Sequence, residues 1–300
     1  MKHFAVAGLL AAVLAGMLLA FPALHQSRQA PLRFPLLPPA LALKAMSLGN
    51  KELAATLIFY NAQFYFGEKY AWRREAPEYQ RLFAALDRAT DLDPYNMDCY
   101  YFAQGLFSDI TPAIPVLNRL LEKGMQHRPN DWYLPFFLSA NHYFQLKDPV
   151  TASHYLQKAA AINPDNAIFA SLSARMLYQG NQTEAAIIYL EGFIKETNNP
   201  AVRKKLLLRL RALTAIHLLE NGVAGFSKKE GRPPRSLGEL VTAGQIKKIP
   251  ADPYGGTFYL EETGKVYTTS KLTENWKNMP TNGATQKNRE SLETSKHRVP

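Results

Sequence analysis

A repeat of about 35 residues is the sequence feature that most constrains the fold. Three segments with a helical pattern of apolar residues each end at a proline, and these prolines, Pro94, Pro129 and Pro164, lie 35 residues apart. Because proline disfavours the helical conformation in the residue before it, each helix is expected to end just before its proline. A small residue stands five positions before each proline, at Ala89, Gly124 and Ala159. The spacing predicts a stack of similar helix pairs.

The helices expected within the repeats are amphipathic and carry start signals. In the segment that ends at Pro164, apolar residues at three- and four-residue spacing predict one buried face, for example Leu156, Ala159, Ala160 and Ile162. One helix pair cannot bury its own apolar face, so several pairs must stack to form a continuous core. Capping residues predict the start of the second helix in three successive pairs, at Thr111, Asp148 and Asn181.

This pattern resembles the tetratricopeptide repeat (TPR) family. The resemblance is closest in residues 133–166, weaker in 63–97 and 98–131, and degenerate in 166–199, so it covers about half of the chain. It implies a mostly α fold, a TPR-like α-solenoid of antiparallel helix pairs over residues 47–200. The residues that carry the resemblance are Tyr101, Gly105, Phe136, Ala140, Ala152, Leu156, Ala159 and Pro164.

The segment at residues 47–70 is similar to the opening segment of a family of membrane-anchored repeat proteins of Gram-negative bacteria. Helical spacing places several of its apolar residues on one face, which predicts the first helix of the array. The residues on that face are Leu53, Leu57, Tyr60, Phe64 and Gly67.

The N-terminal residues 1–24 are expected to form a signal anchor. Phe4 to Leu24 is an uncharged apolar run of 21 residues, long enough to span a bilayer as a helix. It lacks a good small-x-small cleavage site, which favours a transmembrane helix over the alternative, a cleaved signal peptide and a secreted or periplasmic protein. Lys2 predicts a single-pass inner-membrane protein with its soluble part in the periplasm, although Arg28 and Arg33 weigh against this orientation. Residues 25–46 are expected to be a proline-rich linker.

The C-terminal third of the chain differs in sequence pattern from the repeats. Residues 201–227 are expected to form a capping helix, residues 228–271 a small module, and residues 272–300 a disordered tail. In the module, two β-rich runs at 257–260 and 265–268 predict a hairpin. The module resembles the C-terminal region of type II secretion pseudopilins, with residues 249–255 as the core of the match. The chain lacks the pseudopilin prepilin-peptidase glycine and the glutamate inside the apolar helix, so it is not expected to be a pilus subunit.

The sequence contains no motif that predicts catalysis. The single cysteine, Cys99, excludes an intrachain disulfide and a cysteine-based metal site. The seven histidines lack a zinc-protease spacing, and no phosphate-binding loop or nucleophile elbow is present. The formal net charge of +10 is scattered and forms no nucleic-acid motif. We therefore expect no catalytic residue, no cofactor, no metal and no nucleic-acid partner.

A concave groove lined by the first helix of each pair is the expected functional surface, and a protein or peptide partner in the cell envelope is the expected ligand. Packing between helices is the alternative role for each aromatic residue. The predicted groove residues are Phe102, Leu106, Asp109, Phe137, Asn141, Phe144, Ala174 and Leu177.

Three functions follow as hypotheses. The first is a membrane-anchored, periplasm-facing TPR scaffold that binds partners during assembly of an envelope machine, such as a pilus, secretion or export system. The second is an accessory enzyme that processes envelope glycan or peptidoglycan, which requires a cleft with convergent carboxylates. The third is a self-associating structural protein, a homo-oligomer whose groove is filled by its own tail.

Overall fold

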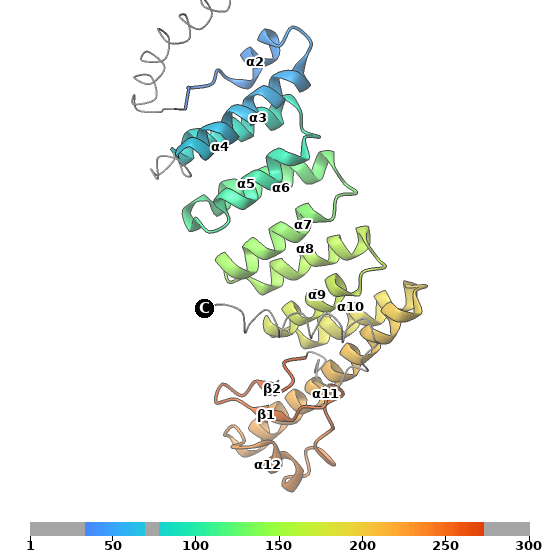
Figure 1. Ribbon diagram of the computed structural model, residues 1–300. Helices are drawn as coiled ribbons and strands as arrows, with labels where there is room; N and C mark the ends of the chain where they lie inside the picture. Colours follow the sequence, from blue (N-terminus) through green and yellow to red (C-terminus); the bar gives the residue numbers. More distant parts are fainter. Residues whose placement is uncertain (1–33, 70–77, 273–300) are drawn as a thin grey trace, which may run out of the picture. The chain divides into compact units, whose positions relative to one another are not determined.

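The computed structural model describes residues 34–69 and 78–272, and contacts divide the chain into two compact units at Pro129 (Figure 1). The predicted mostly α fold is confirmed. Unit 1 contains α2 (Ala40–Met46), α3 (Lys51–Gly67), α4 (Tyr79–Leu92), α5 (Met97–Phe107), the 3-10 turn η2 (Thr111–Ala113) and α6 (Ile114–His127). Unit 2 contains α7 (Tyr133–Ala140), the π-helical turn η3 (Asn141–Gln145), α8 (Pro149–Ile162), α9 (Ala167–Gln179), α10 (Thr183–Glu196), α11 (Pro200–Glu230), α12 (Leu237–Thr242), β1 (Phe258–Leu260) and β2 (Val266–Thr268).

The three periodic prolines end helices as predicted, and the small residues before them take part in each ending. The helices α4, α6 and α8 each stop two residues before their proline. In all three, the carbonyl of the small residue accepts the capping amide: Asp93 to Ala89 at 2.9 Å, Arg128 to Gly124 at 2.9 Å, and Asn163 to Ala159 at 3.0 Å. The small side chains are buried. The repeat in the sequence is therefore a repeat of local backbone geometry.

An Asx residue two positions after each of these prolines starts the following helix. The side chains of Asn96, Asp131 and Asn166 accept hydrogen bonds from the amides of Asp98, Tyr133 and Ile168, at 3.1 to 3.2 Å. These hydrogen bonds satisfy backbone amides at the helix N-terminus that have no carbonyl partner within the helix. The Pro-x-Asx pattern was readable in the sequence, and the sequence analysis missed it.

The caps predicted for the second helices were right in one case of three. Asp148 caps α8, because its carboxylate accepts a hydrogen bond from the amide of Thr151 at 3.0 Å. At Thr111 the chain instead forms the 3-10 turn η2, and α6 begins only at Ile114. Asn181 has a positive φ of 61°, so it closes the preceding turn rather than opening α10 at Thr183.

The folded part of unit 1 begins earlier than the sequence predicted. Residues 34–46 were assigned to the linker, but Phe34 is buried and its ring meets that of Tyr65 edge-on at 5.2 Å. The Phe34 carbonyl accepts a hydrogen bond from Nη1 of Arg81 at 2.8 Å. Pro39 then precedes α2, whose Leu43 is buried. The rest of the predicted linker, residues 25–33, lies outside the described residues.

The core of unit 2 extends without interruption from α8 to β2. Buried residues of α8, α9, α10, α11, α12 and both strands form one hydrophobic cluster. The predicted hairpin is confirmed, with Phe258 opposite Thr268, Tyr259 opposite Tyr267 and Leu260 opposite Val266. The capping helix predicted at 201–227 is the 31-residue α11, capped at its start by Asn199 and ended by Gly231 at a φ of 69°. Leu272, predicted as the first tail residue, is buried in the same core.

None of the helices within residues 34–69 and 78–272 is long and apolar enough to cross a membrane. The predicted anchor at residues 1–24 and the predicted tail from residue 273 onward lie outside the described part of the chain.

Candidate partner-binding surface

In unit 1 the predicted groove residues lie in the middle of α5 (Phe102), near its end (Leu106) and just beyond it (Asp109). Phe102 is half-buried, and its ring lies edge-on to the rings of Phe59 and Phe66, each at 5.9 Å. Its main role is therefore packing of α5 against α3, the alternative that the sequence left open. Leu106 is half-buried and Asp109 is exposed after the helix end. Of the three, only Asp109 is exposed.

In unit 2 three of the predicted groove residues were wrong. Asn141, Ala174 and Leu177 have exposed fractions of 2%, 0% and 6%, so they cannot present a surface to a partner. Ala174 and Leu177 lie on α9, which packs against α8, α10 and α11 and so has little free face. The repeat pattern predicts that these positions lie on the inner face of a helix. It carries no information on how many neighbouring helices cover that face.

Phe144 is the predicted groove residue that remains accessible in unit 2. It lies in the π-helical turn η3 and is 63% exposed. Phe137, one helix earlier, is half-buried between the rings of Tyr133 at 6.0 Å and Phe136 at 6.3 Å. Leu146, two residues after Phe144, is also exposed. π-Helical turns are rare and occur frequently at functional sites.

The backbone that carries Phe144 is held by hydrogen bonds on its C-terminal side. The amide of Asp148 donates to the carbonyl of His142 at 2.9 Å, and Lys147 between them has a positive φ of 55°. Hydrogen bonds from the hydroxyl and amide of Thr151 hold the pKa of the Asp148 carboxyl below its usual value, and His142 acts in the same direction. The turn is therefore a defined structure that presents an apolar ring to solvent.

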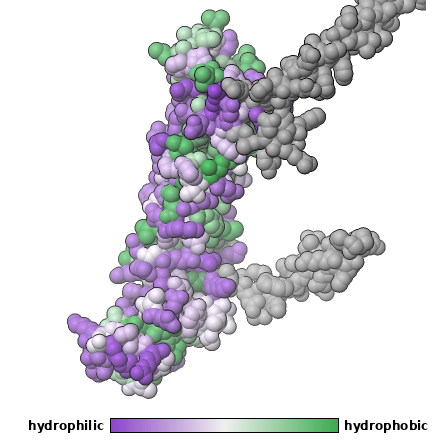
Figure 2. Space-filling model, turned by 90° about the vertical axis from the view of Figure 1, so that its left-hand side faces the viewer, coloured by the Kyte–Doolittle hydropathy of each residue, from purple (hydrophilic) through white to green (hydrophobic). Residues whose placement is uncertain are grey.

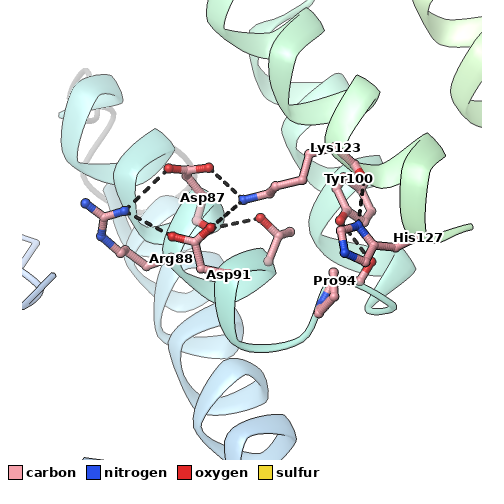
Figure 3. A network of polar contacts seen from close by, with 8 residues as sticks. Asp87, Arg88, Asp91, Pro94, Tyr100, Lys123 and His127 are labelled. Atoms are coloured by element: carbon pink, nitrogen blue, oxygen red, sulfur yellow. Dashed lines mark hydrogen bonds and ion pairs between the residues drawn. The ribbon is translucent and has the colours of Figure 1, made fainter. Parts of the chain in front are cut away.

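Two carboxylates converge in unit 1, and both are paired with cations (Figure 3). Nζ of Lys123 on α6 lies 2.9 Å from Oδ1 of Asp87 and 2.9 Å from Oδ1 of Asp91, both on α4. Nη1 of Arg88 lies 3.1 Å from Oδ2 of Asp91. These half-buried side chains link α6 directly to α4, the α-helix before α5. In this arrangement the two carboxylates have a structural role, because they hold α4 and α6 together through Lys123.

A lysine of the β hairpin caps the C-terminus of α9. Nζ of Lys265 donates to the carbonyls of Tyr178 and Gln179, each at 2.9 Å, and to the Asn181 side chain at 2.7 Å. The hydroxyl of Tyr178 donates in return to the Val266 carbonyl at 2.6 Å. Desolvation lowers the pKa of Lys265, while Glu220 and Glu261 oppose that shift. A cation at a helix C-terminus satisfies carbonyls that have no partner within the helix.

Replacing Lys265 by methionine is expected to lower the free energy of unfolding of unit 2 by about 1–2 kcal/mol, because two helix-end carbonyls lose a charged donor that is partly open to solvent. Urea unfolding followed by circular dichroism measures the change. Lys248→Met is the matched control, since Lys248 is an exposed lysine of the same module. Equal urea midpoints for the two variants would show that the Lys265 cap contributes nothing to the stability of unit 2.

The turn at residues 249–255 is anchored by one buried carboxylate. Asp252 accepts hydrogen bonds from the Tyr254 amide at 2.9 Å and from the hydroxyl of Thr268 on β2. A side chain at Gly256 would lie 2.6 Å from Oδ2 of Asp252, so glycine is required there. The turn therefore packs onto the hairpin by a specific local arrangement.

The same turn covers a buried arginine of α11. Arg209 is 8% exposed, and its Nε and Nη1 have no hydrogen-bond partner among residues 34–69 and 78–272. Its guanidinium carbon lies 5.4 Å from the ring centroid of Tyr254, a cation–π contact that offsets part of the desolvation cost. Burial, together with the like charge of Arg175, lowers the pKa of Arg209.

Within the described residues, no group of three or more His, Cys, Asp or Glu side chains has a geometry that could hold a metal ion. Cys99 lies buried on α5, as expected from its small apolar character, and burial raises the pKa of its thiol to about 12. Comparison with models of known protein families gave no match, and none of the curated proteins matched the chain.

Proposed function

We propose that this protein is a membrane-anchored, periplasm-facing TPR-like scaffold that binds a protein or peptide partner during assembly of an envelope machine such as a pilus, secretion or export system. Successive helix pairs with one cap geometry support a repeat scaffold. The uncharged run from Phe4 to Leu24 supports the anchor. The pseudopilin-like turn at residues 249–255 supports a place among secretion or pilus components.

The single observation that carries the binding role is the exposed aromatic ring at the π-helical turn. Phe144 is 63% exposed in this turn, and its ring contacts that of the neighbouring Tyr143 at 4.9 Å, so most of its apolar surface stays uncovered when the unit folds. Aromatic side chains at accessible, ordered positions are the residues on which binding energy concentrates. Phe144 is therefore the proposed centre of the partner contact, with Leu146 beside it.

Photo-crosslinking in living cells tests this proposal. A photoreactive amino acid in place of Phe144 is expected to capture an envelope protein, and the same amino acid in place of Ile188 is the control. Ile188 lies on α10 of the same unit and is also 63% exposed. Capture that is equal at the two positions, or absent at Phe144, would contradict the proposed contact. A homodimer as the captured product would instead favour the self-association hypothesis.

A further inference from the structure

Helix α3 carries two apolar faces on opposite sides, and one of them is uncovered in the described residues. Ala55, Phe59, Ala62 and Tyr65 are buried against α4, and the Phe59 ring meets that of Phe102 on α5. The opposite side carries apolar residues four, three and four positions apart, which places them in one narrow stripe of the helix. These residues, the outer face of α3, are Leu53, Leu57, Tyr60 and Phe64, with exposed fractions between 49% and 74%.

Further exposed apolar residues lie in α2 and its flanks. Leu41, Met46 and Leu48 are each more than 60% exposed, although they lie in or next to an ordered helix. Figure 2 shows hydrophobic residues on the surface over the α2–α3 end of unit 1. Large contiguous apolar surface on a folded protein marks a place of interaction. The spacing on α3 is regular, so the surface is ordered and directed to one side.

The charge of the surrounding chain indicates what covers this face. From residue 1 to residue 51 the sequence contains no aspartate or glutamate, and its first acidic residue is Glu52. The same segment contains five basic residues: Lys2, Arg28, Arg33, Lys44 and Lys51. A helix face of apolar side chains, preceded by a segment whose charged residues are all basic, is complementary to a surface with an apolar interior and an anionic exterior. The boundary between headgroups and acyl chains of an anionic bilayer has this character.

Chain length brings the outer face of α3 to such a boundary. Nine residues separate the uncharged run that ends at Leu24 from Phe34, which is already packed in unit 1. Even fully extended, the ten steps from Leu24 to Phe34 reach at most about 35 Å. Helix α3, with 17 residues, is about 26 Å long. If the run is inserted in a bilayer, the outer face of α3 is held within reach of the surface of that bilayer.

From these observations we propose that the outer face of α3 lies on the membrane surface, with Leu53, Leu57, Tyr60 and Phe64 inserted among anionic lipids. The proposal rests on the proposed membrane anchor and adds a second, peripheral contact to it. In this proposal unit 1 contacts the bilayer through one defined face, in addition to its attachment through the N-terminal anchor. It also gives a reason for the two apolar faces of α3, one for the core and one for lipid.

Depth-dependent fluorescence quenching tests the proposal on the full chain in vesicles of equal parts phosphatidylglycerol and phosphatidylcholine. A cysteine introduced by Phe64→Cys carries an environment-sensitive fluorophore, and Gln126→Cys on α6 is the control, because Gln126 is an exposed polar residue of the same unit. The native Cys99 is buried, with a thiol pKa near 12, so labelling is selective for the introduced cysteine. Brominated acyl chains are expected to quench the label at Phe64 several-fold more than the label at Gln126.

The outcomes separate the two proposals. Full chain that floats with vesicles and shows no more quenching at Phe64 than at Gln126 overturns the membrane contact of α3 and leaves the anchor in place. Full chain that does not float with vesicles overturns the anchor, and the contact with it. In detergent, a blue shift in the fluorescence emission of the label at position 64 that grows with protein concentration would show that a second copy of the chain covers this face. That result would overturn the lipid contact. Stronger quenching at Phe64 that weakens when phosphatidylcholine replaces phosphatidylglycerol supports the contact in full.

Discussion

Ending the chain after Gly231 is expected to abolish cooperative folding of unit 2. The truncation removes apolar side chains of α12, the following turn and the hairpin that lie in the same core as α9 and α11: Leu237, Leu240, Ile246, Phe258 and Val266. Each such side chain contributes about 1.5–3 kcal/mol when fully buried. The total loss is on the order of 10 kcal/mol, which equals the whole stability of a typical domain.

Urea unfolding monitored by circular dichroism measures this effect. A chain ended after Leu272 is the matched truncation, because it retains every described residue of the hairpin core. The shorter chain is expected to show a broad or missing transition for unit 2, and the longer chain a cooperative one. Similar urea midpoints for the two truncations would mean that the residues after Gly231 form a separate module, as the sequence predicted for residues 228–271.

Replacing Ala159 by leucine is expected to destabilise unit 2 by about 1–3 kcal/mol, because the added methyl groups enter a filled space between helices. Ala159 is fully buried on α8, and its carbonyl accepts the cap of that helix. In a unit of this size, each kcal/mol lowers the midpoint of thermal unfolding by roughly 2–4 °C.

The chain offers a close control for this substitution. Ala159, Ala160 and Ala161 are consecutive on α8, and the first two are buried whereas Ala161 is exposed. Leucine at Ala161 adds the same atoms to the same helix, and it is expected to leave the thermal midpoint nearly unchanged. A similar loss at the two positions would trace the effect to helix propensity and remove the support for close packing at the repeated small residue.

These two experiments address the two levels of organisation in unit 2. The alanine pair tests the repeat itself, in which a small residue permits helices to approach. The truncation pair tests how the array ends, where α11 carries an apolar face that α12 and the hairpin cover. The Lys265 cap joins the two levels, since a hairpin side chain completes the C-terminus of a repeat helix. We infer that α12 and the hairpin serve first to cover the apolar face of α11 at the end of the helical stack.

The binding proposal and the membrane proposal place functions on different units. Phe144 belongs to unit 2, and the outer face of α3 belongs to unit 1. Together the two proposals assign attachment to the bilayer to residues near the N-terminus and partner recognition to the separate turn η3. Because the two contacts use different residues, the crosslinking and quenching experiments report on them independently.

What the sequence alone determined were the features set by local chemistry. Helix ends at Pro94, Pro129 and Pro164 follow from the geometry of proline, the Asp148 cap follows from its side chain, and the hairpin follows from β-branched and aromatic residues around a glycine turn. The tertiary structure alone decided which apolar faces are covered. It buried Asn141, Ala174 and Leu177, exposed the outer face of α3, and placed Lys265 at the end of α9, 86 residues away from Gln179 in the chain. The physical reason is that burial depends on how many neighbours pack around a helix, and the periodicity of one helix carries no information about that number.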